Sequence, residues 1–321
     1  MDLSNITIEK ELQIVFMGTP DFAVPVLEGL IENYNVRAVV SQPDRAKDRN
    51  GNIIETPVKK IAKNHTILVL QPQNIKEDYQ EIIDLNPDLI ITCAYGQIIP
   101  KELLDCPRLG CINVHASLLP KLRGGAPIQR AIMNGYKETG ITIMYMNEKM
   151  DEGDIISQKS IEILDTDTLS SLHDKLMILG KELLLETLPS IIDGTNNRQK
   201  QDSSKISYAF NIKPEEERIS FDKNARQIYN QIRGLNSYPG AYCYFEGKRF
   251  KIWESRLSNN YPMGLNGQIT SIYEDGFGVK VANGEIVFKN VQLEGKKKMS
   301  AKDFINGYPN LIGKMLRWKK K

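Results

Sequence analysis

Short apolar runs alternate with amphipathic stretches along the first part of the chain. Residues 13–18 (QIVFMG) form an apolar run closed by a glycine, and residues 23–32 form the amphipathic stretch that follows it. Further apolar runs occupy residues 36–41, 67–70, 89–92 and 111–115. Buried strands that alternate with helices form a parallel sheet covered on both faces. The pattern therefore predicts an α/β domain, with its site at the carboxyl ends of the strands.

The pattern changes after residue 192. Leucines at helical spacing predict one long amphipathic helix over residues 168–188, closed by Pro189. Residues 193–205 (DGTNNRQKQDSSK) have the composition of a linker. A helix over 225–235 is then followed by strand-like pieces at 240–245, 249–254, 267–273, 278–281 and 285–293. Short strands at such intervals are typical of a small β-barrel, so we expect domains at 1–192 and 206–321, joined by the linker 193–205.

The charge is distributed unevenly between these two parts. The 321 residues carry a net charge of +2, but residues 1–205 hold 22 Lys and Arg against 29 Asp and Glu, whereas residues 206–321 hold 20 against 11. The first part is thus −7 and the second +9. A basic second part favours a polyanion such as nucleic acid as its partner, although a merely solvated surface would show the same excess.

The composition excludes several classes of protein. No apolar run reaches the ~18–20 residues of a membrane span, and the start of the chain is not typical of a secretory signal. The four cysteines (Cys93, Cys106, Cys111 and Cys243) show no CxxC spacing, so we expect no metal site and a reduced, cytoplasmic compartment. The turn at residues 18–21 lacks the GxGxxG spacing and the P-loop lysine, which disfavours the usual nucleotide-binding modes.

A candidate site lies at the end of the run 111–115. Asn113 and His115 are two positions apart, and residues i and i+2 of a strand point to the same face. An amide beside an imidazole can hold and polarise a carbonyl group. A lone histidine is more often structural, so the neighbouring sequence has to decide between the two interpretations.

Five segments together resemble the methionyl-tRNA formyltransferases, in the right order and over nearly the whole chain. They are FMGTPDFAVPVL at 16–27, SQPDRAKDRNGNIIETPVKKIA at 41–62, AYGQIIPKELLD at 94–105, GCINVHASLLPKLRGGAPIQRAIMNGYKETGITIMYMNEKMDEGDII at 110–156, and LNSYPGA at 235–241. The resemblance implies a Rossmann-like formyltransferase domain followed by a small OB-like barrel. It also implies transfer of a formyl group from 10-formyltetrahydrofolate to the α-amine of methionyl initiator tRNA, by an enzyme that we expect to be a monomer.

The resemblance assigns the catalytic roles to Asn113, His115 and Asp151, and the residue types suit them. The amide of Asn113 and a hydrogen-bonding His115 can stabilise the oxyanion that forms when an amine attacks the formyl carbon. Asp151 can orient His115 and help to move protons, also through water. Taken alone, the turn that Asp151 opens would be read as a solvated acidic loop.

The resemblance also implies two binding segments. Ser117, Leu118, Leu119 and Pro120 match the folate-binding loop of the family, and such an apolar wall suits a flat pterin, although a rigid loop packed on the core would look the same. The long polar loop 43–57 would reach the tRNA acceptor stem through Arg45, Lys47 and Arg49. Asp48 and Asn50 stand where the family usually has glycines beside that arginine, which puts the loop's conformation in question. The lysines at 296–298 and the basic residues at 317–321 could add phosphate contacts.

Several alternatives stay open at this point. A sugar-nucleotide N-formyltransferase would share the catalytic residues but would need neither the loop 43–57 nor a basic second domain. Glycinamide ribonucleotide formyltransferase would leave residues 206–321 unexplained. A 10-formyltetrahydrofolate hydrolase would use water as the acceptor. An RNA-binding protein with a degenerate enzyme domain would have no chemical need for Asn113, His115 and Asp151 together.

Overall fold

The computed structural model describes residues 12–45, 47 and 51–319, and these form two compact units. The first unit comprises Met1–Pro127, Thr139–Ile161 and His173–Phe210. The second comprises Ile128–Glu138, Glu162–Leu172 and Asn211–Lys321. The second unit therefore takes in two short segments from the earlier part of the chain, in addition to the C-terminal residues.

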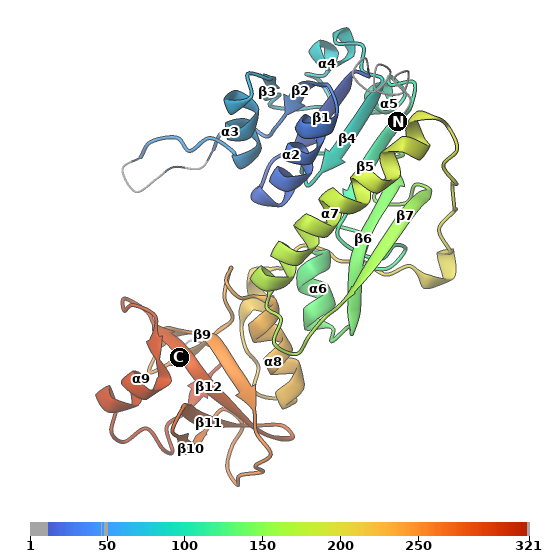
Figure 1. Cartoon of the computed structure of the whole chain (residues 1–321). Helices are drawn as coiled ribbons and strands as arrows, with labels where there is room; N and C mark the ends of the chain where they lie inside the picture. Colours follow the sequence, from blue (N-terminus) through green and yellow to red (C-terminus); the bar gives the residue numbers. More distant parts are fainter. Residues whose placement is uncertain (1–11, 46, 48–50, 320–321) are drawn as a thin grey trace. The chain divides into compact units, whose positions relative to one another are not determined.

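A seven-stranded sheet with the order β3-β2-β1-β4-β5-β6-β7 is the centre of the first unit (Figure 1). Its strands are β1 (Ile14–Gly18), β2 (Val36–Val40), β3 (Leu68–Leu70), β4 (Leu89–Cys93), β5 (Cys111–His115), β6 (Glu138–Tyr145) and β7 (Ile155–Glu162). The first five strands are parallel, and β6 pairs with β5 in the antiparallel sense. Every residue of β1 and β4 is buried, which explains their continuous apolar runs. The predicted Rossmann-like α/β fold is confirmed.

The helices of this part of the chain lie between these strands, except for α7 and η2, which follow β7. They are η1 (Asp21–Ala23), α2 (Val24–Asn33), α3 (Pro57–Asn64), α4 (Gln80–Asp84), α5 (Lys101–Leu104), α6 (Pro127–Met133), α7 (Leu169–Ile192) and η2 (Ser203–Lys205). The prediction that Pro189 closes the long helix is wrong, because α7 continues to Ile192. A proline so close to the end removes only one backbone hydrogen bond, and the carbonyl of Pro189 still accepts from the backbone nitrogen of Asp193 (3.0 Å).

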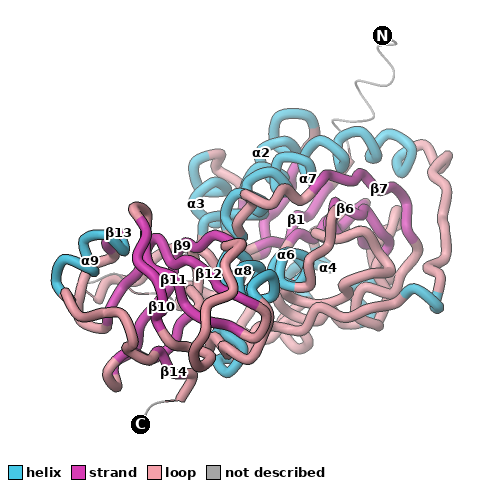
Figure 2. Tube along the Cα trace, turned by 90° about the horizontal axis from the view of Figure 1, so that it is seen from below, coloured by secondary structure: helices cyan, strands magenta, loops and turns pink. Residues whose placement is uncertain are grey.

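The second unit contains a curled antiparallel sheet with the order β10-β11-β12-β9-β8-β14 (Figure 2). Its elements are η3 (Pro214–Glu217), α8 (Ala225–Gly234), β8 (Tyr242–Phe245), β9 (Lys248–Leu257), β10 (Ile269–Tyr273), β11 (Gly276–Val281), β12 (Gly284–Leu293), β13 (Met299–Ser300), α9 (Ala301–Gly307) and β14 (Leu316–Arg317). The backbone nitrogen of Leu316 donates to the carbonyl of Gly267 (2.8 Å), and that of Ile269 donates to Lys314 (2.9 Å). The two ends of the strand order thus meet, and the expected OB-like barrel is confirmed.

Aromatic rings fill the interior of this barrel. Phe250 and Phe277 are fully buried, and the short helix α9 adds Phe304, whose ring centroid lies 4.9 Å from that of Phe250. The strand pattern predicted β8 to β12, but it missed α9, β13 and β14 because these elements are too short to show a period of their own.

A carboxylate is also buried in the barrel. Glu285 on β12 is fully inaccessible, and it accepts hydrogen bonds from the hydroxyls of Ser258 (2.8 Å), Thr270 (3.1 Å) and Tyr273 (2.5 Å). Burial alone would raise the pKa of Glu285, but the hydroxyl donors outweigh burial and lower the pKa below its ordinary value. Gly278 makes room for this group, since a Cβ there would lie 2.0 Å from Oε1 of Glu285.

We expect the substitution Glu285→Gln to lower the free energy of unfolding of the second unit at pH 7 by about 1–3 kcal/mol, because buried hydroxyl donors lose a charged acceptor. The pKa of Glu285 is lower in the folded state than in the unfolded state, so its carboxylate stabilises the fold at pH values above the unfolded-state pKa. This contribution is lost as the pH falls through the folded-state pKa. The difference in the free energy of unfolding between the original protein and Glu285→Gln should therefore shrink below pH 4.5, the ordinary pKa of this carboxyl group. Urea unfolding followed by tryptophan fluorescence measures it, since Trp253 and Trp318 both lie in the second unit.

Glu274→Gln is the matched control, because Glu274 is exposed and should behave like the original protein. Equal unfolding free energies for Glu285→Gln and Glu274→Gln at pH 7 would contradict the stabilising role of Glu285.

Candidate functional site

Strand β5 carries Asn113 and His115 to the carboxyl end of the parallel part of the sheet. The strand is flanked by β4, where Thr92 pairs with Asn113, and by β6, where Thr142 pairs with His115. Ile112 and Val114 are buried on the opposite face of the strand. The alternation predicted from the sequence therefore places the amide and the imidazole on one face, as expected.

His115 is held between a backbone carbonyl and a carboxylate. The side chain is only 6% exposed, and Nε2 lies 3.2 Å from the carbonyl oxygen of Leu122. A carbonyl oxygen can only accept, so Nε2 carries the proton. Nδ1, the other ring nitrogen, lies 3.7 Å from Oδ1 of Asp151. Nδ1 is therefore the ring nitrogen with a free lone pair, and it faces the carboxylate of Asp151.

Asn113 presents a hydrogen-bond donor. Its Oδ1 accepts from the hydroxyl of Thr92 (2.8 Å), which fixes the orientation of the amide. Within the part of the chain that the structure describes, Nδ2 of Asn113 has no hydrogen-bond partner. This NH2 group can therefore donate to an oxygen that carries developing negative charge.

Asp151 reaches the site from the turn between β6 and β7. Its backbone has a φ of 51°, a left-handed conformation that costs a non-glycine residue of order 1 kcal/mol. Oδ2 accepts from the backbone nitrogen of Gly124 (2.8 Å), which leaves Oδ1 turned toward His115. The structure thus brings Asn113, His115 and Asp151 together from two separate parts of the sequence.

The loop that follows His115 is held by a hydrogen-bond network. The hydroxyl of Thr142 donates to the carbonyl of Ser117 (2.6 Å) and accepts from the backbone nitrogen of Leu119 (3.1 Å). Ser117 and Leu119 are buried, whereas Leu118 and Pro120 are partly exposed. Of the four residues expected to bind folate, Leu118 and Pro120 therefore offer side-chain surface, and the other two shape the loop.

The polar loop 43–57 has a fixed base. The carboxylate of Asp44 accepts from the side chain of Lys59 and from the backbone nitrogen of Thr56 (3.1 Å). Arg45 and Lys47 are exposed, and Lys47 forms an isolated antiparallel bridge with Ile53. Arg49, the third residue expected to contact nucleic acid, lies outside the described residues.

Two further residues beside the site were not expected from the sequence. Arg123 is only 3% exposed, and its guanidinium contacts the side chains of Gln201 and Glu152. Gln201 belongs to the stretch 193–205 that was expected to be a linker, and it donates to the carbonyl of Asp151 (2.7 Å). A partner 50 positions away leaves no local pattern, so composition alone could not reveal this contact.

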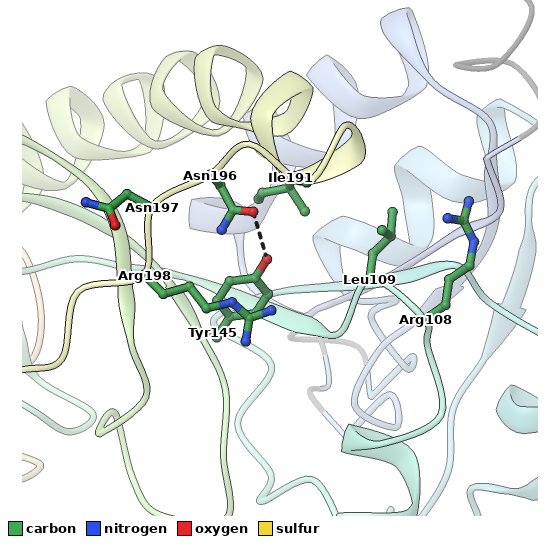
Figure 3. Close-up of a pocket in the computed structure, with 8 residues that line it drawn as sticks. Arg108, Leu109, Tyr145, Ile191, Asn196, Asn197 and Arg198 are labelled. Carbon is green, nitrogen blue, oxygen red and sulfur yellow. Dashed lines mark hydrogen bonds between the residues drawn. The ribbon is translucent and has the colours of Figure 1, made fainter.

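A separate cavity of about 490 Å³ lies by the other end of β5 (Figure 3). Its lining residues are Arg108, Leu109, Tyr145, Ile191, Gly194, Asn196, Asn197 and Arg198. The guanidinium of Arg198 stacks on the ring of Tyr145 at 3.7 Å, and the hydroxyl of Tyr145 points to Asn196 (3.4 Å). Tyr145 pairs with Ile112, so this cavity is distinct from the site at His115.

Comparison with known proteins decides the family. The family model described as formyl transferase matches residues 12–188, and the model of the formyl transferase C-terminal domain matches residues 211–309. The methionyl-tRNA formyltransferase of Geobacillus sp. (strain WCH70) is 50% identical over 301 residues, which cover 92% of this chain and 94% of that protein. The chain belongs to the methionyl-tRNA formyltransferase family. Two further relatives match over a similar extent. The methionyl-tRNA formyltransferase of Bacillus subtilis is 48% identical and covers 92% of this chain and 94% of that protein. That of Staphylococcus aureus strain JH1 is 47% identical and covers 95% of this chain and 99% of that protein.

Solved structures agree with the fold. The sugar 3N-formyl transferase WlaRD, solved with dTDP and 5-N-formyl-THF, matches with a TM-score of 0.68 at 23% identity, covering 89% of this chain and 99% of that one. HypX from Aquifex aeolicus in complex with tetrahydrofolic acid matches with a TM-score of 0.62 at 14% identity, covering 94% of this chain and 48% of that one. At such identities the likeness shows the fold alone. Within the described residues, no helix is long and apolar enough to cross a membrane, and no His, Cys, Asp and Glu cluster could hold a metal ion.

Proposed function

We propose that this chain transfers the formyl group of 10-formyltetrahydrofolate to the α-amine of methionyl initiator tRNA. The observation that carries the proposal is the geometry of Asn113, His115 and Asp151, an amide donor and an imidazole–carboxylate pair at the carboxyl end of β5. The family membership supplies the donor and the acceptor.

The reaction forms one C–N bond and breaks another. The methionine amine attacks the formyl carbon, and Nδ2 of Asn113 donates to the oxyanion of the tetrahedral intermediate. His115, oriented by Asp151, accepts the proton that leaves the attacking nitrogen. His115 then passes that proton to N10 of the folate as the bond between N10 and the formyl carbon breaks. The imidazole thereby returns to its neutral form.

The donor would lie against the loop that begins at Ser117. The partly exposed Leu118 and Pro120 supply apolar surface for the pterin, and Ser117 and Leu119 hold the loop in shape through Thr142. Two of the solved structures with this fold were obtained with a folate, one with 5-N-formyl-THF and one with tetrahydrofolic acid.

The acceptor tRNA would be held by two regions. The exposed Arg45 and Lys47, together with Arg49, would contact the acceptor stem, and the domain 206–321 would bind the backbone through its positive charge. The barrel offers a suitable surface, because the ammonium groups of Lys251 and Lys298 lie 5.1 and 5.5 Å from the ring of Trp253. In this proposal the residues 1–192 carry the chemistry, 193–205 join the domains, and the enzyme works in the cytoplasm.

A panel of acceptors tests the proposal. The chain is given 10-formyltetrahydrofolate with methionyl initiator tRNA, free methionine or a nucleotide-linked aminosugar, and the formylated products are identified by mass. We expect formylation of the charged tRNA, and little of either small acceptor. Formylation of the aminosugar in preference to the tRNA would overturn the assigned acceptor.

A further inference from the structure

The chain returns to the catalytic loops after it leaves helix α7. The backbone of Arg123 donates to the carbonyl of Ser207 (2.9 Å) and accepts from the backbone nitrogen of Ala209 (2.7 Å). Upstream in the same stretch, Gln199 exchanges two backbone hydrogen bonds with Ile155. The stretch between these two anchors contains Gln201, and all of it belongs to the first unit.

The side-chain amide of Gln201 uses its full bonding capacity. Its Nε2 donates to the carbonyls of Asp151 (2.7 Å) and Gly153 (2.9 Å). Its Oε1 accepts from Nε (3.1 Å) and Nη2 (2.9 Å) of Arg123. An amide has two donors and two acceptor lone pairs, so all four positions are filled. The pattern also fixes the orientation, because a flipped amide would turn its NH2 toward the guanidinium.

The two segments that this amide joins are those that hold His115. Leu122, next to Arg123, accepts from Nε2 of His115, and Asp151 faces Nδ1. The backbone of Gly124, on the other side of Arg123, donates to Oδ2 of Asp151. Gln201 therefore links the segments that carry the two groups on either side of the imidazole, and it binds the backbone of Asp151, which is in a left-handed conformation.

We infer that Gln201 is a positioning residue for formyl transfer, which aligns Asp151 with His115 through the backbone of the turn 151–153. The inference rests on the proposed function. It makes the stretch expected to be a mere linker a part of the catalytic site, although Gln201 contacts neither substrate in this role.

Two substitutions separate positioning from a general loss of structure. Gln201→Glu keeps the size and can still accept from Arg123, but it replaces the two donors by an oxygen that faces two carbonyls. Gln201→Met keeps the approximate length and removes the bonds without adding charge. Because a misplacement of about 1 Å in a catalytic group can cost 10²-fold in rate, we expect kcat to fall about 10- to 100-fold in both.

Three readouts distinguish this role from a structural one. We expect the KM values for donor and tRNA to stay within about threefold, since a transition-state contribution is lost rather than binding. The pH at which kcat reaches half its maximum should move, because the spacing of Asp151 and His115 changes. In the background of Asp151→Asn, replacing Gln201 should lower kcat little further, since both changes act through the carboxylate of Asp151.

Gln199→Glu is the matched control, because Gln199 is an exposed glutamine of the same stretch that bonds to the described residues through its backbone alone. It should retain the original kcat. Full activity of both Gln201 variants would overturn the inference. A lower kcat would also overturn it if the pH profile did not move and if replacing Gln201 lowered kcat just as much in the Asp151→Asn background. The parent chain is assayed in parallel: if it does not formylate methionyl-tRNA, the proposed function fails, whereas an active parent with active Gln201 variants refutes only the positioning role.

Discussion

Replacing His115 by alanine is expected to lower the rate of formyl transfer by about 10²- to 10⁴-fold, the contribution of a positioned acid–base group. The substitution removes the ring that lies between the carbonyl of Leu122 and the carboxylate of Asp151, and with it the group that accepts the proton of the attacking amine. Asp151→Asn should produce a loss in the same range, because an amide cannot stabilise the charged imidazole. Single-turnover formylation of methionyl-tRNA measures both.

His65→Ala is the matched control, since His65 is exposed at the end of α3 and should leave the rate unchanged. Circular dichroism should show that the His115 and Asp151 variants are folded, because both groups lie at the end of the sheet rather than within its apolar layers. Near-normal turnover in both variants would refute the assignment of the site.

The affinity for tRNA is expected to fall on the order of 10³-fold between 50 and 200 mM salt, if about six phosphates are contacted. The reason is that the positive charge of residues 206–321 releases counterions from the RNA when the two bind. Filter binding of methionyl-tRNA over this range of salt gives the slope of log affinity against log salt concentration.

Replacing Lys297 and Lys298 by glutamine should make that slope shallower by about 1 to 2, because these exposed lysines are expected to neutralise phosphates. Replacing Lys76 and Lys101, two exposed lysines of the first unit, removes the same charge and should leave the slope unchanged. A flat salt dependence in the parent chain would remove the argument that the second unit binds a polyanion.

The fold could be predicted from the sequence wherever local pattern determines it. Continuous apolar runs predicted the buried parallel strands, and the spacing of Asn113 and His115 placed both side chains on one face of β5. Pro189 misled the prediction, since a proline in the last turn of α7 does not end the helix. Local pattern also could not show that residues 128–138 and 162–172 belong to the second unit, because such membership depends on long-range packing.

The site was only partly visible in the sequence. Asp151 came from the family resemblance, since an acidic turn by itself is typical of a solvated loop. Gln201 had no signal at all, because a polar stretch reads as a linker unless its partners are known, and those partners lie 48 to 78 positions away. Arg123 shows the same limit, because local sequence does not show that this charged side chain is buried.

The path of a labelled formyl group tests the central claim most directly. The chain is mixed with 10-formyltetrahydrofolate that carries ¹⁴C in the formyl group and with methionyl initiator tRNA, and the label is located after one turnover. The account predicts that the label appears as N-formylmethionine released from the tRNA by mild base, and that this product is lost with His115→Ala. Label recovered as free formate, at the same rate with and without the tRNA, would contradict it.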